Sequence, residues 1–257
     1  MRILMIRHGD PDYEHDSLTE TGKKEAAFLA EIAGSLHLGD CFVSPLGRAK
    51  ETASYTLKKL GLQAETLDWL QEFPARLDIN GSEVLQRAYP DTRKKDGKYA
   101  PRIVWDMMPS YYLTHPEYMN REGWRTSEVA RHSDIVVAYD YVTEHFDRLL
   151  AAYGYVREGM HYRAEKANTD TVTFFCHFGV TCVFLSHLMN VSLFTLWHGT
   201  VLAPTSITEI VTEEREQGFA MFRSQRLGDT HHLLAGGTGP SFAARFCETY
   251  DNKEQRH

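Results

Sequence analysis

Three short segments, far apart in the chain, carry side chains suited to a phosphoryl group. Arg7-His8-Gly9, Arg48 and His177 each come just after a short apolar run. Guanidinium forks match phosphate oxygens bidentately, and a neutral imidazole can attack phosphorus. These residue types predict phosphoryl chemistry at one site, provided that the fold brings the three segments together.

The elements that must position these residues are short apolar strands that alternate with helices. Apolar runs predict strands at 3–6, 41–43, 64–70 and 171–176. Helical spacing predicts helices over 19–39, 49–60 and 134–153, and a buried helix over 180–189. A hairpin is predicted from 206–212 and 219–225, which flank a charged turn with Gly218.

Strands that alternate with helices predict an α/β fold, a three-layer open and mostly parallel sheet with helices on both faces. In such a sheet, ligands bind at the carboxyl ends of the strands. Arg7, His8, Arg48 and His177 should therefore share one edge. Glu72 ends the predicted third strand and should reach the same crevice.

Between about 73 and 133 the alternation stops, among five prolines, many charges and several aromatic residues. This segment has ten basic and eight acidic residues in a chain of net charge −7. We interpret it as an inserted cap that selects an anionic substrate, with Arg76 as a candidate contact. The expected organisation is a single domain over 1–235 that contains this insertion, and a polar tail over 236–257.

Composition excludes several classes of protein. The net charge of −7 argues against a protein that neutralises nucleic-acid phosphates. Four cysteines without a C-x-x-C pair predict neither disulfides nor a zinc knuckle, which fits a reducing cytoplasm. The absence of an 18-residue apolar run argues against a membrane span, and the short apolar start argues against an export signal. His231 and His232 are adjacent and lack ligand spacing, so no metal site is expected.

The motifs together resemble the histidine phosphatase superfamily, the phosphoglycerate mutase-like proteins. The resemblance covers residues 1 to about 72 and 134–233, and it rests on five motifs: Arg7-His8-Gly9, Leu18-Thr19-x-x-Gly22, Ser44-Pro45-Leu46-x-Arg48-Ala49-x-x-Thr52-Ala53, Leu70-x-Glu72 and Cys176-His177-Phe178-Gly179.

The resemblance implies a role for each residue. His8 would become phosphorylated, Arg7, Arg48 and His177 would grip the phosphoryl oxygens, and Glu72 would protonate the leaving oxygen. No metal or other cofactor is then required, because the arginines and His177 supply the positive charge. The expected partner is a small phosphorylated metabolite, with neither nucleic acid nor a membrane involved.

The sequence departs from the family pattern at three places, the last of which is Phe73-Pro74-Ala75-Arg76 after Glu72, where the mutase pattern is not copied. Asp10-Pro11-Asp12-Tyr13-Glu14 stands where mutases of the group show x-Ser-x-Trp-Asn after Arg-His-Gly, and Phe178 replaces the usual small residue, which keeps a backbone N–H but narrows the pocket. We therefore expect a metal-independent phosphatase acting through phosphohistidine. A phosphoglycerate-type mutase and a catalytically silent phospho-ligand binding module remain alternatives. Neither the substrate nor the oligomeric state follows from the sequence.

Overall fold

The structure is a computed structural model that describes residues 1–241 and 249–251. The chain divides into two compact units. The first contains Met1–Glu72, Asp147–Thr181 and the described residues from Val201 onward, and the second contains Phe73–Phe146 and Cys182–Thr200. The predicted insertion at 73–133 falls entirely within the second unit.

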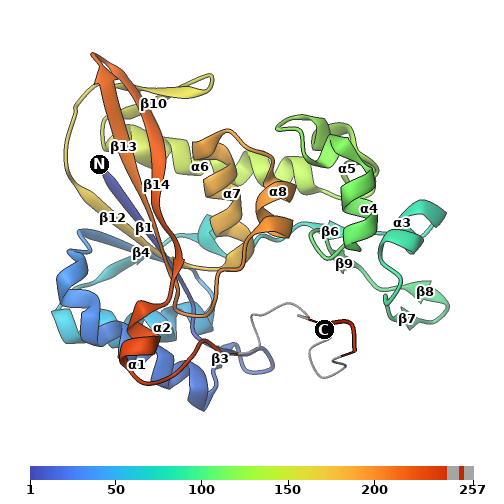
Figure 1. Cartoon of the computed structure of the whole chain (residues 1–257), viewed down its shortest axis with the longest axis horizontal. Helices are drawn as coiled ribbons and strands as arrows, with labels where there is room; N and C mark the ends of the chain where they lie inside the picture. Colours follow the sequence, from blue (N-terminus) through green and yellow to red (C-terminus); the bar gives the residue numbers. More distant parts are fainter. Residues whose placement is uncertain (242–248, 252–257) are drawn as a thin grey trace. The chain divides into compact units, whose positions relative to one another are not determined.

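A mixed sheet forms the centre of the first unit, on the left of Figure 1. Its strands, in spatial order, are β10 (Tyr155–Glu158), β11 (His161–Ala164), β14 (Phe219–Asp229), β13 (Ile207–Glu216), β1 (Arg2–Arg7), β12 (Thr171–Cys176), β4 (Asp40–Val43) and β5 (Ala64–Thr66). From β1 to β5 neighbouring strands run parallel, and from β10 to β1 they run antiparallel.

The predicted α/β class is confirmed, and the predicted hairpin is present as β13 and β14. The antiparallel pairing of β13 with β14 has a local cause. Gly218 has φ of +74° in the tight turn between β13 and β14, and a chain that reverses in so few residues pairs antiparallel. The parallel half is the one whose strand ends carry the motifs.

The helices of the first unit begin and end at the expected kinds of residue. They are α1 (Glu20–Leu36), α2 (Gly47–Leu60) and α9 (His231–Ala235). Thr19 caps α1 by accepting a hydrogen bond from the Gly22 N–H at 3.1 Å. Gly61, with φ of +66°, ends α2. A small hairpin of β2 (Pro11–Asp12) and β3 (Ser17–Leu18) precedes α1.

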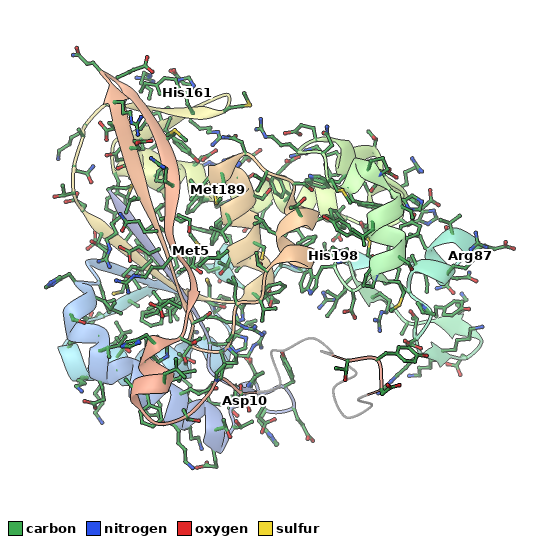
Figure 2. The ribbon with its side chains drawn as sticks, viewed as in Figure 1. Met5, Asp10, Arg87, His161, Met189 and His198 are labelled. Carbon is green, nitrogen blue, oxygen red and sulfur yellow. The ribbon has the colours of Figure 1, made fainter. Side chains whose placement is uncertain are left out.

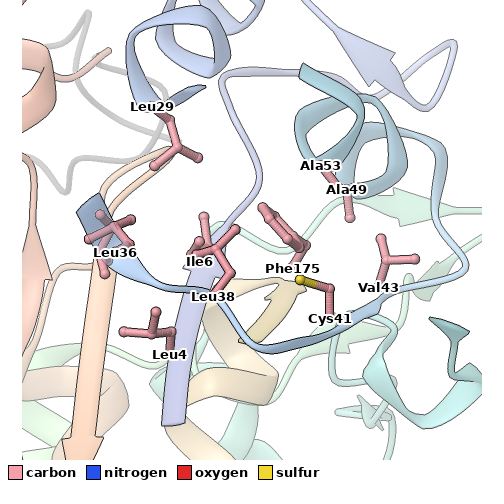
Figure 3. Packing of buried hydrophobic residues seen from close by; sticks show 11 residues of the cluster. Leu4, Ile6, Leu29, Leu36, Leu38, Cys41, Val43, Ala49, Ala53 and Phe175 are labelled. Atoms are coloured by element: carbon pink, nitrogen blue, oxygen red, sulfur yellow. The ribbon is translucent and has the colours of Figure 1, made fainter. Parts of the chain in front are cut away.

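One buried cluster joins α1 and α2 to the sheet (Figure 3). Side chains that recur at helical spacing on the two helices meet strand residues that alternate on one face: Leu29, Leu36, Ala49 and Ala53 against Leu4, Ile6, Val43 and Phe175. The alternate strand residues, such as Ile3 and Met5, are equally buried, so both faces of the strand are covered.

The predicted strand over 64–70 is wrong beyond Thr66. Only Ala64–Thr66 pairs with β4, and Asp68–Leu70 forms a short 3-10 helix, η1. Trp69 and Leu70 are buried through this turn rather than through a strand. Glu72 therefore lies on a loop after η1, instead of at a strand end.

The second unit holds short elements and many aromatic side chains. Its elements are β6 (Arg76–Leu77), α3 (Glu83–Ala88), β7 (Lys94–Lys95), β8 (Lys98–Tyr99), β9 (Arg102–Ile103), α4 (Pro109–Thr114), η2 (Pro116–Tyr118), η3 (Gly123–Thr126), α5 (Glu128–Arg131) and α8 (Leu193–Gly199). Two longer helices, α6 (Ile135–Ala152) and α7 (Phe178–Met189), continue from one unit into the other.

Three sequence expectations concern a membrane span, the cysteines and the C-terminal tail. Across residues 1–241 and 249–251, every helix falls short of the length and apolarity that a bilayer crossing requires. Within those ranges Cys41, Cys176 and Cys182 are buried, whereas Cys247 lies outside them. Of the predicted tail at 236–257, residues 242–248 and 252–257 also lie outside the described residues.

Candidate active site

The parallel half of the sheet brings the three motifs together. Arg7 at the end of β1 lies opposite Cys176 of β12, and Val43 of β4 lies opposite Phe175. The chain therefore leaves three adjacent parallel strands at one edge, just before His8, Ser44 and His177. The His8 and His177 ring centroids are 5.0 Å apart.

His8 is a buried imidazole whose tautomer can be read from its hydrogen bond. Its Nδ1 lies 2.7 Å from the carbonyl oxygen of Gly9. A carbonyl oxygen only accepts, so Nδ1 carries the proton and Nε2 keeps its lone pair. Burial, and then the positive charges of Arg7 and Arg48, hold the pKa of His8 well below its usual range. The ring is neutral at pH 7, as a nucleophile must be.

The backbone around His8 is held from several sides. The Gly9 N–H donates to Thr52 Oγ1 at 2.9 Å, and the Thr205 N–H donates to the His8 carbonyl at 3.2 Å. Gly9 has no room for a side chain, because a Cβ there would lie 2.7 Å from the Gly22 carbonyl oxygen. The motif glycine is therefore required by its contact with the start of α1.

The residue after the motif extends this anchoring. Asp10, labelled in Figure 2, donates its N–H to Glu25 Oε2 at 2.8 Å and accepts from the Thr19 hydroxyl at 2.6 Å. Glu25 is buried on α1 and also accepts the Ser241 N–H. The loop after β1 is thus fastened to α1 by side chains as well as by packing.

Arg7 is oriented by a loop that the sequence motifs do not include. Its Nη1 donates to the carbonyl oxygen of Leu202, and its backbone N–H donates to Ser206. Its guanidinium carbon lies 5.7 Å from the ring centroid of Phe178, the residue after the second histidine. Phe178 thus supports one of the two phosphate-binding candidates by a cation–π contact.

Arg48 lies in the first turn of α2 and is held by Asp16. Its Nη1 donates to Asp16 Oδ1 at 2.7 Å, while Asp16 Oδ2 accepts the Gly47 N–H at 2.6 Å. The guanidinium carbon lies 5.4 Å from the Tyr13 ring centroid. Among the described residues its buried Nε has no hydrogen-bond partner. Arg48 is not paired with Glu51 on the helix surface, because Glu51 accepts the Leu18 N–H instead.

His177 is fully buried between the first histidine and β4. Its Nε2 lies 2.7 Å from Ser44 Oγ. Burial, followed by His8, Arg48 and Arg7, lowers the pKa of His177 well below its usual range. The positive charges of Arg7 and Arg48 therefore act on both histidines.

Glu72 approaches this group through the start of α7. Its Oε1 accepts the Val180 N–H at 3.3 Å, three residues after His177. A carboxylate at a helix N-terminus also stabilises the helix by capping it. Glu72 therefore has a structural role at α7 whether or not it transfers a proton.

The described structure thus places His8 beside His177, with Arg7 next to His8 in the chain and the charges of Arg7 and Arg48 acting on both histidines, and it links Glu72 to this group through Val180. Arg76 belongs to the second unit, where its N–H donates to Asp134, so its contact with substrate stays a prediction.

Sequence reasoning missed three supporting residues. Asp16 and Thr205 have φ of +47° and +55°, and this backbone geometry leaves no pattern in the sequence. Ser44 belongs to one of the sequence motifs, but nothing in the sequence indicates that His177 is its hydrogen-bond partner.

The site residues do not form an evident metal centre. Within 1–241 and 249–251, no group of three or more histidine, cysteine, aspartate or glutamate side chains is placed to hold a metal ion. The two guanidiniums and two imidazoles at the site suit an anion.

The first part of the sequence is similar to a known family. Residues 3–102 match the model of the histidine phosphatase superfamily, branch 1. Among curated proteins, none matches the chain.

Solved structures show the same fold over nearly the whole chain. Phosphoserine phosphatase from Entamoeba histolytica, in complex with phosphoserine, is 16% identical, with a TM-score of 0.55 over 91% of this chain and 99% of its own. A mycobacterial glucosyl-3-phosphoglycerate phosphatase gives 16% and 0.54, over 88% and 98%. The alpha-ribazole phosphatase of Shigella flexneri gives 17% and 0.53, over 90% and 97%. At these identities the likeness shows the fold alone.

Proposed function

We propose that this histidine phosphatase hydrolyses a small phosphomonoester, without a metal, through a phosphohistidine on Nε2 of His8. One observation carries the proposal: His8 is a neutral imidazole whose Nδ1–H is bound to Gly9, beside His177 and within the field of both arginines. That state leaves Nε2 as the nucleophile.

Two displacements at phosphorus account for turnover. In the first, His8 Nε2 attacks phosphorus, the bond to the leaving oxygen breaks, and the Glu72 carboxyl group gives its proton to that oxygen. In the second, water attacks the phosphohistidine, Glu72 takes a proton from the water, and the N–P bond breaks to release phosphate. Arg7, Arg48 and His177 stabilise the charge on the three non-bridging oxygens throughout.

The similar solved structures support this reaction class without naming the substrate. Several are described as phosphatases of small phosphoesters, and the mycobacterial enzyme has also been solved in complex with VO3. Vanadate resembles the transferring phosphoryl group, so an anion site of this shape fits the proposed chemistry. A small phosphorylated metabolite in the cytoplasm is the expected partner.

The test measures hydrolysis of p-nitrophenyl phosphate in the presence of EDTA. We expect turnover to survive chelation, because the protein's own cations supply the charge, and vanadate to inhibit competitively. His8→Ala should reduce turnover to background and abolish acid-labile phosphohistidine, while His161→Ala, a surface histidine on β11, should behave as wild type. Loss of activity in EDTA that zinc restores would overturn the metal-free mechanism.

A screen of phosphorylated metabolites then identifies the substrate and the reaction type. Each compound is scored both for free phosphate and for an isomerised phosphoester. Free phosphate supports the phosphatase, and an isomerised product would favour the mutase.

A further inference from the structure

Ser44 and His177 form a hydrogen bond at the centre of the site that the proposed reaction does not yet use. Both residues are fully buried, and Ser44 Oγ lies 2.7 Å from His177 Nε2. They follow the neighbouring parallel strands β4 and β12, and the Ser44 N–H donates to the Phe175 carbonyl at 3.0 Å. The contact is therefore fixed by the sheet itself.

The hydrogen-bonding capacity of Ser44 decides the direction of this bond. Its Oγ accepts the Leu46 N–H at 3.2 Å, and its other partner among the described residues is His177 Nε2. If Nε2 carried a proton, the buried hydroxyl would accept twice and its own O–H would have no acceptor. Because a buried donor without an acceptor is unfavourable, the hydroxyl donates to Nε2.

The proton of the neutral His177 ring then belongs on Nδ1. This nitrogen is buried and has no hydrogen-bond partner in the part of the chain that the structure describes. A buried N–H without a partner, next to the nucleophile and two guanidiniums, is expected to donate a hydrogen bond to an oxygen atom of a ligand.

We propose that Ser44 is a positioning residue that holds His177 in its Nδ1–H tautomer, so that this N–H donates to a non-bridging oxygen of the phosphoryl group. The inference rests on the proposed function for the identity of that oxygen.

The two histidines are thereby held in complementary states by different partners. The Gly9 carbonyl holds His8 with a lone pair at Nε2, and the Ser44 hydroxyl holds His177 with a proton at Nδ1. A flipped His177 tautomer would turn a lone pair toward the phosphoryl oxygens, which repels them. Ser44 therefore keeps His177 a hydrogen-bond donor, whereas His8 keeps the lone pair of the nucleophile.

The experiment reads the tautomer directly in the full chain, by long-range proton–nitrogen NMR on protein with ¹⁵N-labelled imidazoles. In the wild type we expect His177 Nε2 to be pyridine-like and Nδ1 pyrrole-like, with the Nδ1 signal shifting when orthovanadate is added. A pyridine-like Nδ1 in the wild type, or an Nδ1 signal that vanadate leaves unmoved, overturns the proposal.

The variant Ser44→Ala tests the consequence. It should shift His177 toward the Nε2–H tautomer and lower kcat/KM for p-nitrophenyl phosphate about 10- to 100-fold, the scale seen when a partner that orients a histidine is lost. Ser186→Ala removes another buried serine hydroxyl, on α7, and should change neither the tautomer nor kcat/KM. A folded Ser44→Ala that keeps the wild-type tautomer and rate contradicts the proposal.

Failure of the proposed function gives a different result. A wild-type protein that hydrolyses no phosphoester refutes the phosphatase proposal, while the wild-type tautomer still decides the role of Ser44. If Ser44→Ala does not fold, the wild-type NMR and the vanadate response alone give the answer.

Discussion

At the scale of single residues, the chemistry of the site depends on which nitrogen of each histidine carries the proton. His8 and His177 are both buried and neutral, but one presents a lone pair and the other an N–H. Glu72 differs from both, because its carboxylate already caps α7 through Val180. Its acid role and its capping role can be separated by a substitution that keeps the oxygen and removes the proton.

We expect Glu72→Gln to slow alkyl phosphates about 10²- to 10⁴-fold and aryl phosphates much less. The amide still accepts from Val180, but it cannot protonate a poor leaving oxygen. The measurement compares kcat for p-nitrophenyl phosphate and for an alkyl phosphate, together with the rate of phosphohistidine formation. Equal slowing of both substrates with normal phosphohistidine formation would show that Glu72 is not the acid, and Asp78 or Glu83 would be tested next.

The pH profile tests the neutral histidines. Because burial and the arginines lower the pKa of His8 and His177, protonation of these rings should not reduce kcat/KM until the pH is well below 6.5. We expect nearly constant kcat/KM for p-nitrophenyl phosphate between pH 7 and pH 6, once the ionisation of the substrate is allowed for. A tenfold fall per pH unit starting near 6.5 would contradict the assigned protonation states.

At the scale of elements, the start of α1 is packed directly against the loop that carries the nucleophile. A Cβ at Gly22 would lie 2.2 Å from the Asp10 carbonyl oxygen, a backbone atom that cannot rotate away. Gly34, on the same helix, has Leu60 Cδ2 at 3.8 Å as its nearest contact, which is ordinary packing. One helix thus contains a required glycine and a replaceable one.

Gly22→Ala should therefore lower the free energy of unfolding by about 2–4 kcal/mol and reduce kcat, because α1 must move away from the loop after His8. Gly34→Ala should leave kcat unchanged and stabilise the protein by about 0.5–1 kcal/mol, because alanine favours the helix. Urea unfolding and p-nitrophenyl phosphate turnover measure the two effects. Similar stability and activity in both variants would refute the close contact at Gly22.

At the scale of the whole molecule, several buried histidines make stability depend on pH. Burial lowers the pKa of His198, in the second unit, and that of His232, in the first, to about 4 in each case. His8 and His177 are shifted in the same direction. Between the folded pKa and about 6.5, the unfolded chain binds more protons than the folded one, so stability falls as the pH is lowered. Glu25 opposes this, since burial raises its pKa.

We expect the free energy of unfolding to fall by several kcal/mol between pH 7 and pH 5, with up to about 2 kcal/mol from each of the four histidines, less the opposing contribution of Glu25. Denaturant unfolding at the two pH values measures the difference. His232→Gln should reduce this dependence, since it removes one buried imidazole. Stability that rises toward pH 5 would show that these histidines are not buried in neutral form.

The sequence alone determined the parts of this protein that depend on short-range pattern. Thr19 and Gly61 mark helix ends, apolar runs mark the strands, and the motif residues follow directly after those runs. A parallel sheet then predicts that Arg7, His8, Arg48 and His177 lie at one edge, because the carboxyl ends of neighbouring parallel strands share an edge of the sheet. Local composition also predicted the β13–β14 hairpin through its turn.

Only the tertiary structure decided which groups hold these residues in place. Asp16 accepts a hydrogen bond from Arg48, 32 residues away in the sequence, and Ser44 forms a hydrogen bond with His177, 133 residues away. Neither pair has a spacing that a sequence pattern could indicate. The segment at 68–70 became a 3-10 turn because Trp69 and Leu70 are buried without strand pairing. Residue types can predict the chemistry, but the tautomer and orientation of each side chain depend on neighbours that only the folded chain supplies.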